Sequence, residues 1–138
     1  MDVKRINDHL SVSPQINPED IAAIKAQGFV AIINNRPDGE SPDQPTSAHI
    51  EKVAQEAGLA YHYIPLGREG VSPDMVEKTR AVLEGSNGPV FAYCRSGTRS
   101  TTLWALSQAG EAPAEEIISA AANAGYDMSH LAGHLSQK

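Results

Sequence analysis

The sequence has a single cysteine and no long apolar run, and each shortage excludes a class of protein. One cysteine, Cys94, permits neither an internal disulfide nor a cysteine-rich zinc site, and such scarcity is typical of the reducing cytoplasm. No apolar run approaches the roughly 20 residues that a membrane-spanning helix needs. The polar residues 1–14 do not have the pattern of a secretory signal. We therefore expect a cytoplasmic protein without a membrane partner.

Positive charge is also scarce, because 11 Lys and Arg residues stand against 17 Asp and Glu residues and the net charge is −6. Such a chain offers no basic face to a phosphate backbone, which argues against a nucleic-acid partner. Of the five histidines, only His130 and His134 are spaced to share a helix face, and we interpret them as the solvated end of a C-terminal helix. The sequence therefore points to no metal and no cofactor.

The 138 residues suit one domain, residues 1–138, whose core rests on Ile, Val, Leu and Ala because aromatic residues make up only 5%. Apolar segments predict strands, and segments that begin at a capping residue and end near a glycine predict helices. The predicted strands are residues 10–13, 29–34, 59–65 and 89–93, and the predicted helices are about 18–27, 46–57, 73–83, 98–109 and 113–124, with a short helix after Asp127.

This alternation predicts an α/β fold in which a mostly parallel sheet of about four to five strands is covered by helices on both faces. Ligands bind such sheets at the carboxyl ends of the strands. We therefore expect the loops after Asn34, Pro65 and Tyr93 to converge on one site. The loop of residues 35–45 is long for a compact domain, which is typical of a functional loop.

The segment that begins at Cys94 follows the last predicted strand and carries the clearest chemical signal. Backbone N–H groups between a strand and a helix start lack partners, and they bind an anion when they curl around one point. Gly97 permits such a curl, and Arg99 offers a planar fork for two oxygens. The positive electrostatic field of the loop N–H groups, the helix start and Arg99 is expected to favour the thiolate form of Cys94, which makes it a nucleophile. The remaining loop residues, which we expect to bind the anion together with Gly97, are Arg95, Ser96 and Thr98.

Ser100 directly follows Arg99, and we expect its hydroxyl to stabilise the sulfur of Cys94 when a covalent intermediate breaks down. The expected catalytic residues are therefore Cys94, Arg99 and Ser100.

Three further arginines lie near the expected site, and each has two interpretations. Arg95 either contacts the substrate or points to solvent, and the same alternatives hold for Arg68. Arg36 follows a buried strand and either joins the anion site or pairs with Asp38 or Glu40.

At these residues the chain resembles the cysteine-based phosphatases and the rhodaneses. Tyrosine and dual-specificity phosphatases have one residue more between Cys and Arg, whereas the spacing from Cys94 to Arg99 matches the rhodanese pattern Cys-Arg-x-Gly-x-Arg/Thr. Residues 30–37 and 61–65, and the helix before Pro89, resemble instead a small dual-specificity phosphatase domain. This resemblance implies a protein-tyrosine-phosphatase-like fold of three layers.

Residues 33–40 and 93–100 together resemble one family, the phosphatase-like domain of the beta-lactamase-hydrolase-like proteins, which is also classed as a sulfur transferase family. The resemblance covers nearly the whole chain. In some bacteria this domain is fused to a metallo-beta-lactamase-like persulfide dioxygenase. That fusion implies a role in persulfide handling, with a persulfide dioxygenase as a partner.

Two departures from the phosphatase pattern bear on the reaction. The shorter loop offers a smaller ring of donors, which suits the terminal sulfur of a persulfide better than a tetrahedral phosphate. Phosphatases also protonate the leaving oxygen with an Asp after the strand that ends near Pro65, but residues 66–70 contain none. Glu69 and Asp38 are the candidate acids in its place. Sulfur transfer needs no such acid, because sulfite or a thiolate leaves without a proton.

Three functions are therefore considered, each with a small anionic or sulfane-sulfur ligand. The first, which both departures favour and which we expect, is a sulfurtransferase that carries sulfur as a Cys94 persulfide to an external thiol, since the chain has no second cysteine. The second is a phosphomonoester hydrolase with a phosphocysteine intermediate and Arg99 on the phosphoryl oxygens. The third is a non-catalytic module that binds anions or senses thiols.

Overall fold

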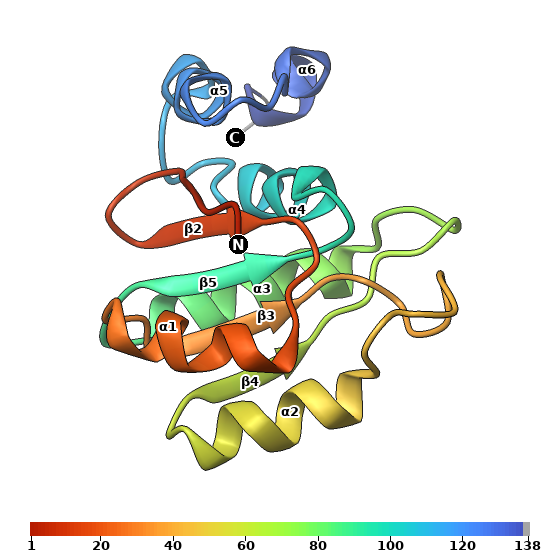
Figure 1. The fold of residues 1–138 in the computed structure, drawn as a ribbon. Helices are drawn as coiled ribbons and strands as arrows, with labels where there is room; N and C mark the ends of the chain where they lie inside the picture. Colours follow the sequence, from red (N-terminus) through yellow and green to blue (C-terminus); the bar gives the residue numbers. More distant parts are fainter. Residues whose placement is uncertain (137–138) are drawn as a thin grey trace.

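The computed structural model of the protein describes residues 1–136, in which strands and helices alternate along the chain (Figure 1). The strands are β1 (Lys4–Arg5), β2 (Leu10–Ser13), β3 (Ala31–Asn34), β4 (Ala60–Tyr63) and β5 (Val90–Tyr93). The helices are α1 (Ile21–Ala26), α2 (Ser47–Glu56), α3 (Pro73–Gly85), α4 (Thr98–Ser107), α5 (Ala114–Asn123) and α6 (Ala132–Leu135), with short 3₁₀ turns η1 (Pro18–Asp20) and η2 (Ser129–Leu131).

The five strands form one sheet in the order β1-β2-β5-β3-β4. β2, β5, β3 and β4 run parallel, and only β1 is antiparallel to its neighbour β2. The prediction of a mostly parallel sheet in an α/β fold is confirmed. Because parallel strands end at the same edge, the loops that follow β2, β3, β4 and β5 all leave the sheet together, at the right of Figure 1.

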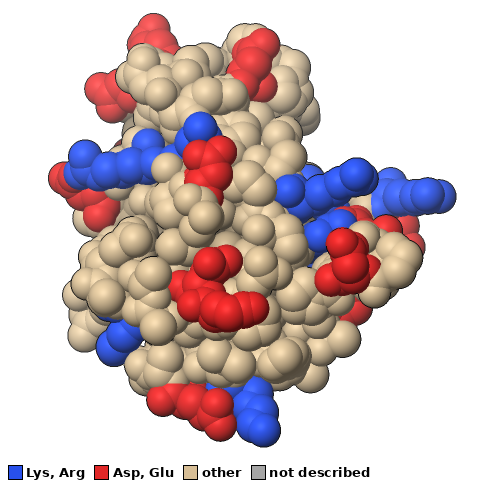
Figure 2. All heavy atoms as spheres, viewed as in Figure 1, with Lys and Arg blue, Asp and Glu red and all other residues tan. Residues whose placement is uncertain are grey.

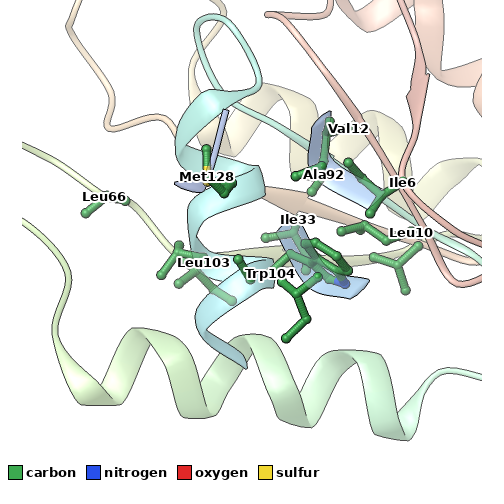
Figure 3. Packing of buried hydrophobic residues seen from close by; sticks show 14 of the residues in the cluster. Ile6, Leu10, Val12, Ile33, Leu66, Ala92, Leu103, Trp104 and Met128 are labelled. Carbon is green, nitrogen blue, oxygen red and sulfur yellow. The ribbon is translucent and has the colours of Figure 1, made fainter. Parts of the chain in front are cut away.

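Helices cover both faces of the sheet, as expected (Figure 1). Ile32 and Phe91 lie in one buried cluster with residues of α1 and α2. Their strand neighbours, Ile33 and Ala92, lie in the other cluster, with residues of α4 and α5. Figure 3 shows Trp104, which comes from α4, packed close to Ile33 in that second cluster. Strands buried on both faces explain the continuous apolar runs in the sequence.

Two details differ from the sequence-based expectation. β1 was not expected, because a two-residue polar strand carries no hydrophobic pattern, and its pairing with β2 is a tertiary effect. The helix expected after Asn17 is divided into η1 and α1, with a reciprocal capping box between Asn17 and Asp20. Within residues 1–136, no helix has the length and apolar character needed to cross a membrane.

Candidate active site

Cys94 is the first residue after β5, the central strand of the sheet. Its backbone N–H donates to the carbonyl of Ser13 at 3.4 Å, so the end of β2 fixes the point where the chain leaves the sheet. The cysteine is fully buried. Three residues later Gly97 has a φ of +94°, in the left-handed region, and α4 begins directly after it. A short left-handed turn therefore bends the chain from strand to helix around the sulfur.

The carbonyl groups of this loop are held by partners outside it. The carbonyl of Arg95 accepts the backbone N–H of Gln15 at 3.4 Å, and the carbonyl of Ser96 accepts the hydroxyl of Tyr126 at 3.0 Å. The carbonyl of Gly97 accepts both the N–H and the hydroxyl of Thr101. With the carbonyls engaged in this way, the loop can offer its remaining N–H groups to an anion.

The amides of the loop are the backbone donors of the candidate site. The N–H of Gly97 donates to Sγ of Cys94 at 3.0 Å. The N–H groups of Arg95 and Ser96 have no acceptor anywhere in residues 1–136. The loop therefore places one backbone donor on the sulfur and keeps two further donors that an anion can use.

Arg99 lies in the first turn of α4, and three of its five N–H donors are engaged. Nη1 donates to Glu40 Oε2 and to the carbonyl of Leu66, and Nη2 donates to Glu40 Oε1, each at 2.8 Å. The two donors that no protein oxygen engages, Nε–H and the second hydrogen of Nη2, lie side by side on one edge of the guanidinium, and a hydrogen bond between Arg99 and Cys94 also contributes to the raised pKa of Arg99. This free edge forms a fork for two oxygens of an anion.

Glu40 links two arginines of the site, the buried Arg36 and the half-buried Arg99. Its hydrogen bond from Arg99 is the main cause that lowers the pKa of the Glu40 carboxyl to about 2, and Arg36 adds to the effect. The same bond is the main cause that raises the pKa of Arg99, and the nearby charge of Cys94 raises it further. Glu40 is therefore ionised at neutral pH and holds Arg99 in a fixed orientation.

Arg36 takes the pairing that the sequence had left as its alternative role. It is buried, its Nε donates to Glu40 at 2.9 Å, and its Nη1 donates to the side chain of Gln15 at 3.0 Å. The structure thus places it beneath Glu40 and does not bring it into the hollow described below. Arg36 supports the site through Glu40.

Ser100 is buried, and its Oγ has no hydrogen-bond partner within residues 1–136. An unpartnered buried hydroxyl is rare in proteins, and it destabilises the fold unless another molecule or another state satisfies it. Ser96 and Thr98 lie on the exposed side of the loop, where their hydroxyls are 3.1 Å apart.

The two candidate acids differ in position. Asp38 lines the hollow at the site, where its Oδ1 accepts the N–H of Ser47 at 2.7 Å and its own N–H donates to Tyr63. Glu69 is exposed on the loop after β4 and is not among the residues that line the hollow. The structure therefore brings Asp38, and not Glu69, to the edge where the loops meet.

A hollow of about 510 Å³ opens at this edge of the sheet, and its wall is formed by three of the converging loops. The lining residues are residues 37–40, Gly67, Arg68, Arg95 and Arg99. Within residues 1–136, no group of three or more His, Cys, Asp and Glu side chains is arranged to hold a metal ion.

Tyr126 contributes to the site and was missed in the sequence. Its hydroxyl holds the carbonyl of Ser96, and a Cβ placed on Gly97 would lie 2.2 Å from Tyr126 Oη. The residue follows α5, 30 positions after Ser96, and no local pattern connects it with the loop. Glu40 was considered only as a partner of Arg36, because nothing in the sequence shows that its loop reaches α4.

The fold and the loop together are those of a phosphatase-like domain, with Cys94 directly after β5 and Arg99 in the first turn of α4. The family described as "Beta-lactamase hydrolase-like protein, phosphatase-like domain" matches residues 2–111. The chain belongs to this family, as the sequence had indicated.

The relatives agree with this assignment. A beta-lactamase hydrolase-like protein of Agrobacterium fabrum is 38% identical over 109 residues, which cover 79% of this chain and 25% of that protein, so the chain spans only a quarter of its relative. A candidate phosphatase of Neisseria meningitidis has a similar structure, with a TM-score of 0.83, 35% identity, and coverage of 99% of this chain and 97% of the other.

A more distant structure shows the fold alone. The PTP-2 phosphatase of Cydia pomonella has a TM-score of 0.73 at 15% identity, with coverage of 99% of this chain and 89% of the other. The expected protein-tyrosine-phosphatase-like fold is therefore confirmed.

Proposed function

We propose that the chain is a cysteine-dependent phosphomonoester hydrolase that works through a phosphocysteine at Cys94. The observation that carries this proposal is the free edge of Arg99, because two donors side by side match two oxygens of a phosphoryl group. The membership of a phosphatase-like family and the likeness to the Neisseria candidate phosphatase support the same chemistry.

The first step forms the covalent intermediate. Sγ of Cys94 attacks phosphorus, the S–P bond forms, and the ester P–O bond breaks with its electron pair on the leaving oxygen. That oxygen needs a proton, and Asp38 is the carboxyl group in the hollow that can supply it. Arg99 and the free loop amides stabilise the charge on the phosphoryl oxygens.

The second step releases phosphate. Water attacks phosphorus, a new P–O bond forms, the S–P bond breaks, and the electron pair returns to Sγ. The Asp38 carboxylate takes the proton of the water. The unpartnered hydroxyl of Ser100 is available to stabilise the departing thiolate, which gives a reason for its burial without a partner.

A second candidate function is sulfur transfer, and the length of the loop favours it, because only four residues separate Cys94 from Arg99. Cys94 would attack the outer sulfur of thiosulfate, and sulfite would leave with its electron pair and without a proton. An external thiolate would then attack the terminal sulfur of the Cys94 persulfide and release the Cys94 thiolate. In this reading the natural partners are a thiol acceptor and a persulfide dioxygenase.

The role of Asp38 separates the two functions. We would measure kcat/KM for phosphate release from an aryl phosphate and for sulfite release from thiosulfate with a thiol acceptor. Hydrolysis through Asp38 predicts that Asp38→Asn lowers phosphate release about 10²–10⁴-fold, while Glu56→Gln on the exposed face of α2 has no effect. Sulfur transfer would be favoured if kcat/KM for sulfite release exceeds that for phosphate release and is unchanged in Asp38→Asn. If the protein binds sulfate but catalyses neither reaction, the third function, a non-catalytic anion-binding module, is the one that stands.

A further inference from the structure

Four of the six arginines of the chain lie near one edge of the sheet, although the chain as a whole carries a net charge of −6. Arg36 and Arg99 share the carboxylate of Glu40. Arg68 and Arg95 are exposed, and neither forms an ion pair with any residue between positions 1 and 136. Figure 2 shows basic side chains gathered with acidic ones on the right, where the loops of Figure 1 project.

Both unpaired arginines line the same hollow as Arg99. Arg95 comes from the loop of Cys94, and Arg68 comes from the loop after β4, so two separate segments bring their charges to one cavity. At about 510 Å³ the hollow is the size of a pocket for a small organic molecule and is larger than a single phosphoryl group requires. The hollow therefore has room beside Arg99 for more than a phosphoryl group, with Arg68 and Arg95 on its wall.

Neither acidic residue of the hollow forms an ion pair with Arg68 or Arg95. Glu40 is bound by two other arginines, and Oδ1 of Asp38 accepts a backbone N–H at the start of α2. Two like charges that share a cavity repel each other, and a bound anion relieves that repulsion.

We propose that Arg68 and Arg95 form a second anion subsite, so that the substrate carries a further phosphate or carboxylate group beyond the one above Cys94. The proposal rests on the proposed function and names its substrate class, a small molecule with two anionic groups. Arginine suits this task because its planar fork binds phosphate and carboxylate through two parallel hydrogen bonds. Arg99 then selects the reacting group, and the second subsite selects the molecule that bears it.

Binding to the full-length Cys94→Ser variant tests the subsite without turnover. Calorimetry would compare two matched probe pairs with different spacing, methylphosphonate with methylenebisphosphonate and fructose 6-phosphate with fructose 1,6-bisphosphate. In at least one pair we expect the probe with two anionic groups to bind about tenfold tighter or more. The ratio of the two affinities within that pair should fall toward one when Arg68→Ala and Arg95→Ala are added. Arg5→Ala, which removes one positive charge from an exposed residue of β1 and is compared with each single variant, should leave the ratio intact.

Each other outcome overturns a defined part of the account. Equal affinities within both pairs, or an equal loss of the ratio in Arg5→Ala, would refute the subsite. If the probes with one anionic group bind while the ratio of affinities within each pair stays near one, the subsite fails and the proposed function stands. If no probe binds, the anion cradle and the subsite fail together.

Discussion

The carboxylate of Glu40 accepts both Nη groups of Arg99 at 2.8 Å, although 59 residues separate the two in sequence. The loop between β3 and α2 thereby reaches α4 and sets which edge of the guanidinium stays free. The loop is itself held in shape, since Glu40 N–H donates to the side chain of Gln44, and Gln44 donates to the carbonyl of Pro37. The irregular loop between β3 and α2 is thus part of the site, and it fixes the orientation of Arg99.

The first prediction concerns stability and pH. The pKa of Glu40 falls from 4.5 to about 2 on folding, chiefly through its bond from Arg99, so its contribution is full above pH 4.5 and is lost as the pH falls toward 2. Glu40→Gln should lower the free energy of unfolding at pH 7 by about 1–3 kcal/mol, because Arg36 is left buried without its partner. The side chain is 29% exposed, and solvent screening keeps the loss within this range.

Urea titrations at several pH values would measure this effect. The difference between the wild type and Glu40→Gln should shrink between pH 4.5 and pH 2. Glu56→Gln, on an exposed site of α2, serves as the matched control and should show little change. A difference that grows toward low pH would contradict the account.

The second prediction separates stability from turnover at Ser100. Its Oγ has no partner in residues 1–136, so Ser100→Ala should leave the melting temperature unchanged or higher, and it should slow turnover about 10²-fold. Ser107 is a matched control in the same helix, because it is also buried but donates to the carbonyl of Trp104 at 2.7 Å. Ser107→Ala should cost about 0.5–1.5 kcal/mol and spare turnover. Equal effects of the two variants on turnover would argue against a role for Ser100.

The third prediction concerns Tyr126. Tyr126→Phe keeps the ring and removes the hydrogen bond to the carbonyl of Ser96, which frees that carbonyl to turn toward the anion position. Inorganic phosphate should then bind about 3- to 10-fold more weakly as a competitive inhibitor. Tyr61→Phe removes a hydroxyl that hydrogen-bonds Ser47 at 2.6 Å, away from the residues that line the hollow, and is the control for a lost hydroxyl. Weakening of the same size in both variants would show that the position of Tyr126 is unimportant.

The fourth prediction concerns Gly97. A side chain there meets both a left-handed φ of +94° and the ring of Tyr126, whose Oη would lie 2.2 Å from the new Cβ. Gly97→Ala should destabilise the fold by about 1–3 kcal/mol and abolish phosphate binding. Gly85→Ala is the control, because Gly85 has neither a left-handed φ nor a neighbour within 4 Å. Adding Tyr126→Ala should restore part of the stability, and a complete restoration would show that the backbone carries no strain.

The sequence was sufficient for the sheet and for the loop of Cys94, because buried parallel strands and a glycine before a helix leave local patterns. It was insufficient where two distant segments meet. The pairing of Glu40 with Arg99 depends on the path of a loop of irregular structure, and the contact of Tyr126 depends on how α5 packs against α4. The two-residue strand β1 was missed because its pairing partner defines it.

The trapped intermediate tests the central claim most directly. The protein would be mixed with an aryl phosphate, quenched in acid within the first turnover, and digested for mass spectrometry, with Cys94→Ser as the control. We predict a phosphoryl group on the peptide that contains Cys94, with a larger amount in Ser100→Ala, because that variant slows breakdown of the adduct. An unmodified Cys94 during measurable phosphate release would contradict the account, as would a peptide that gains mass only from thiosulfate.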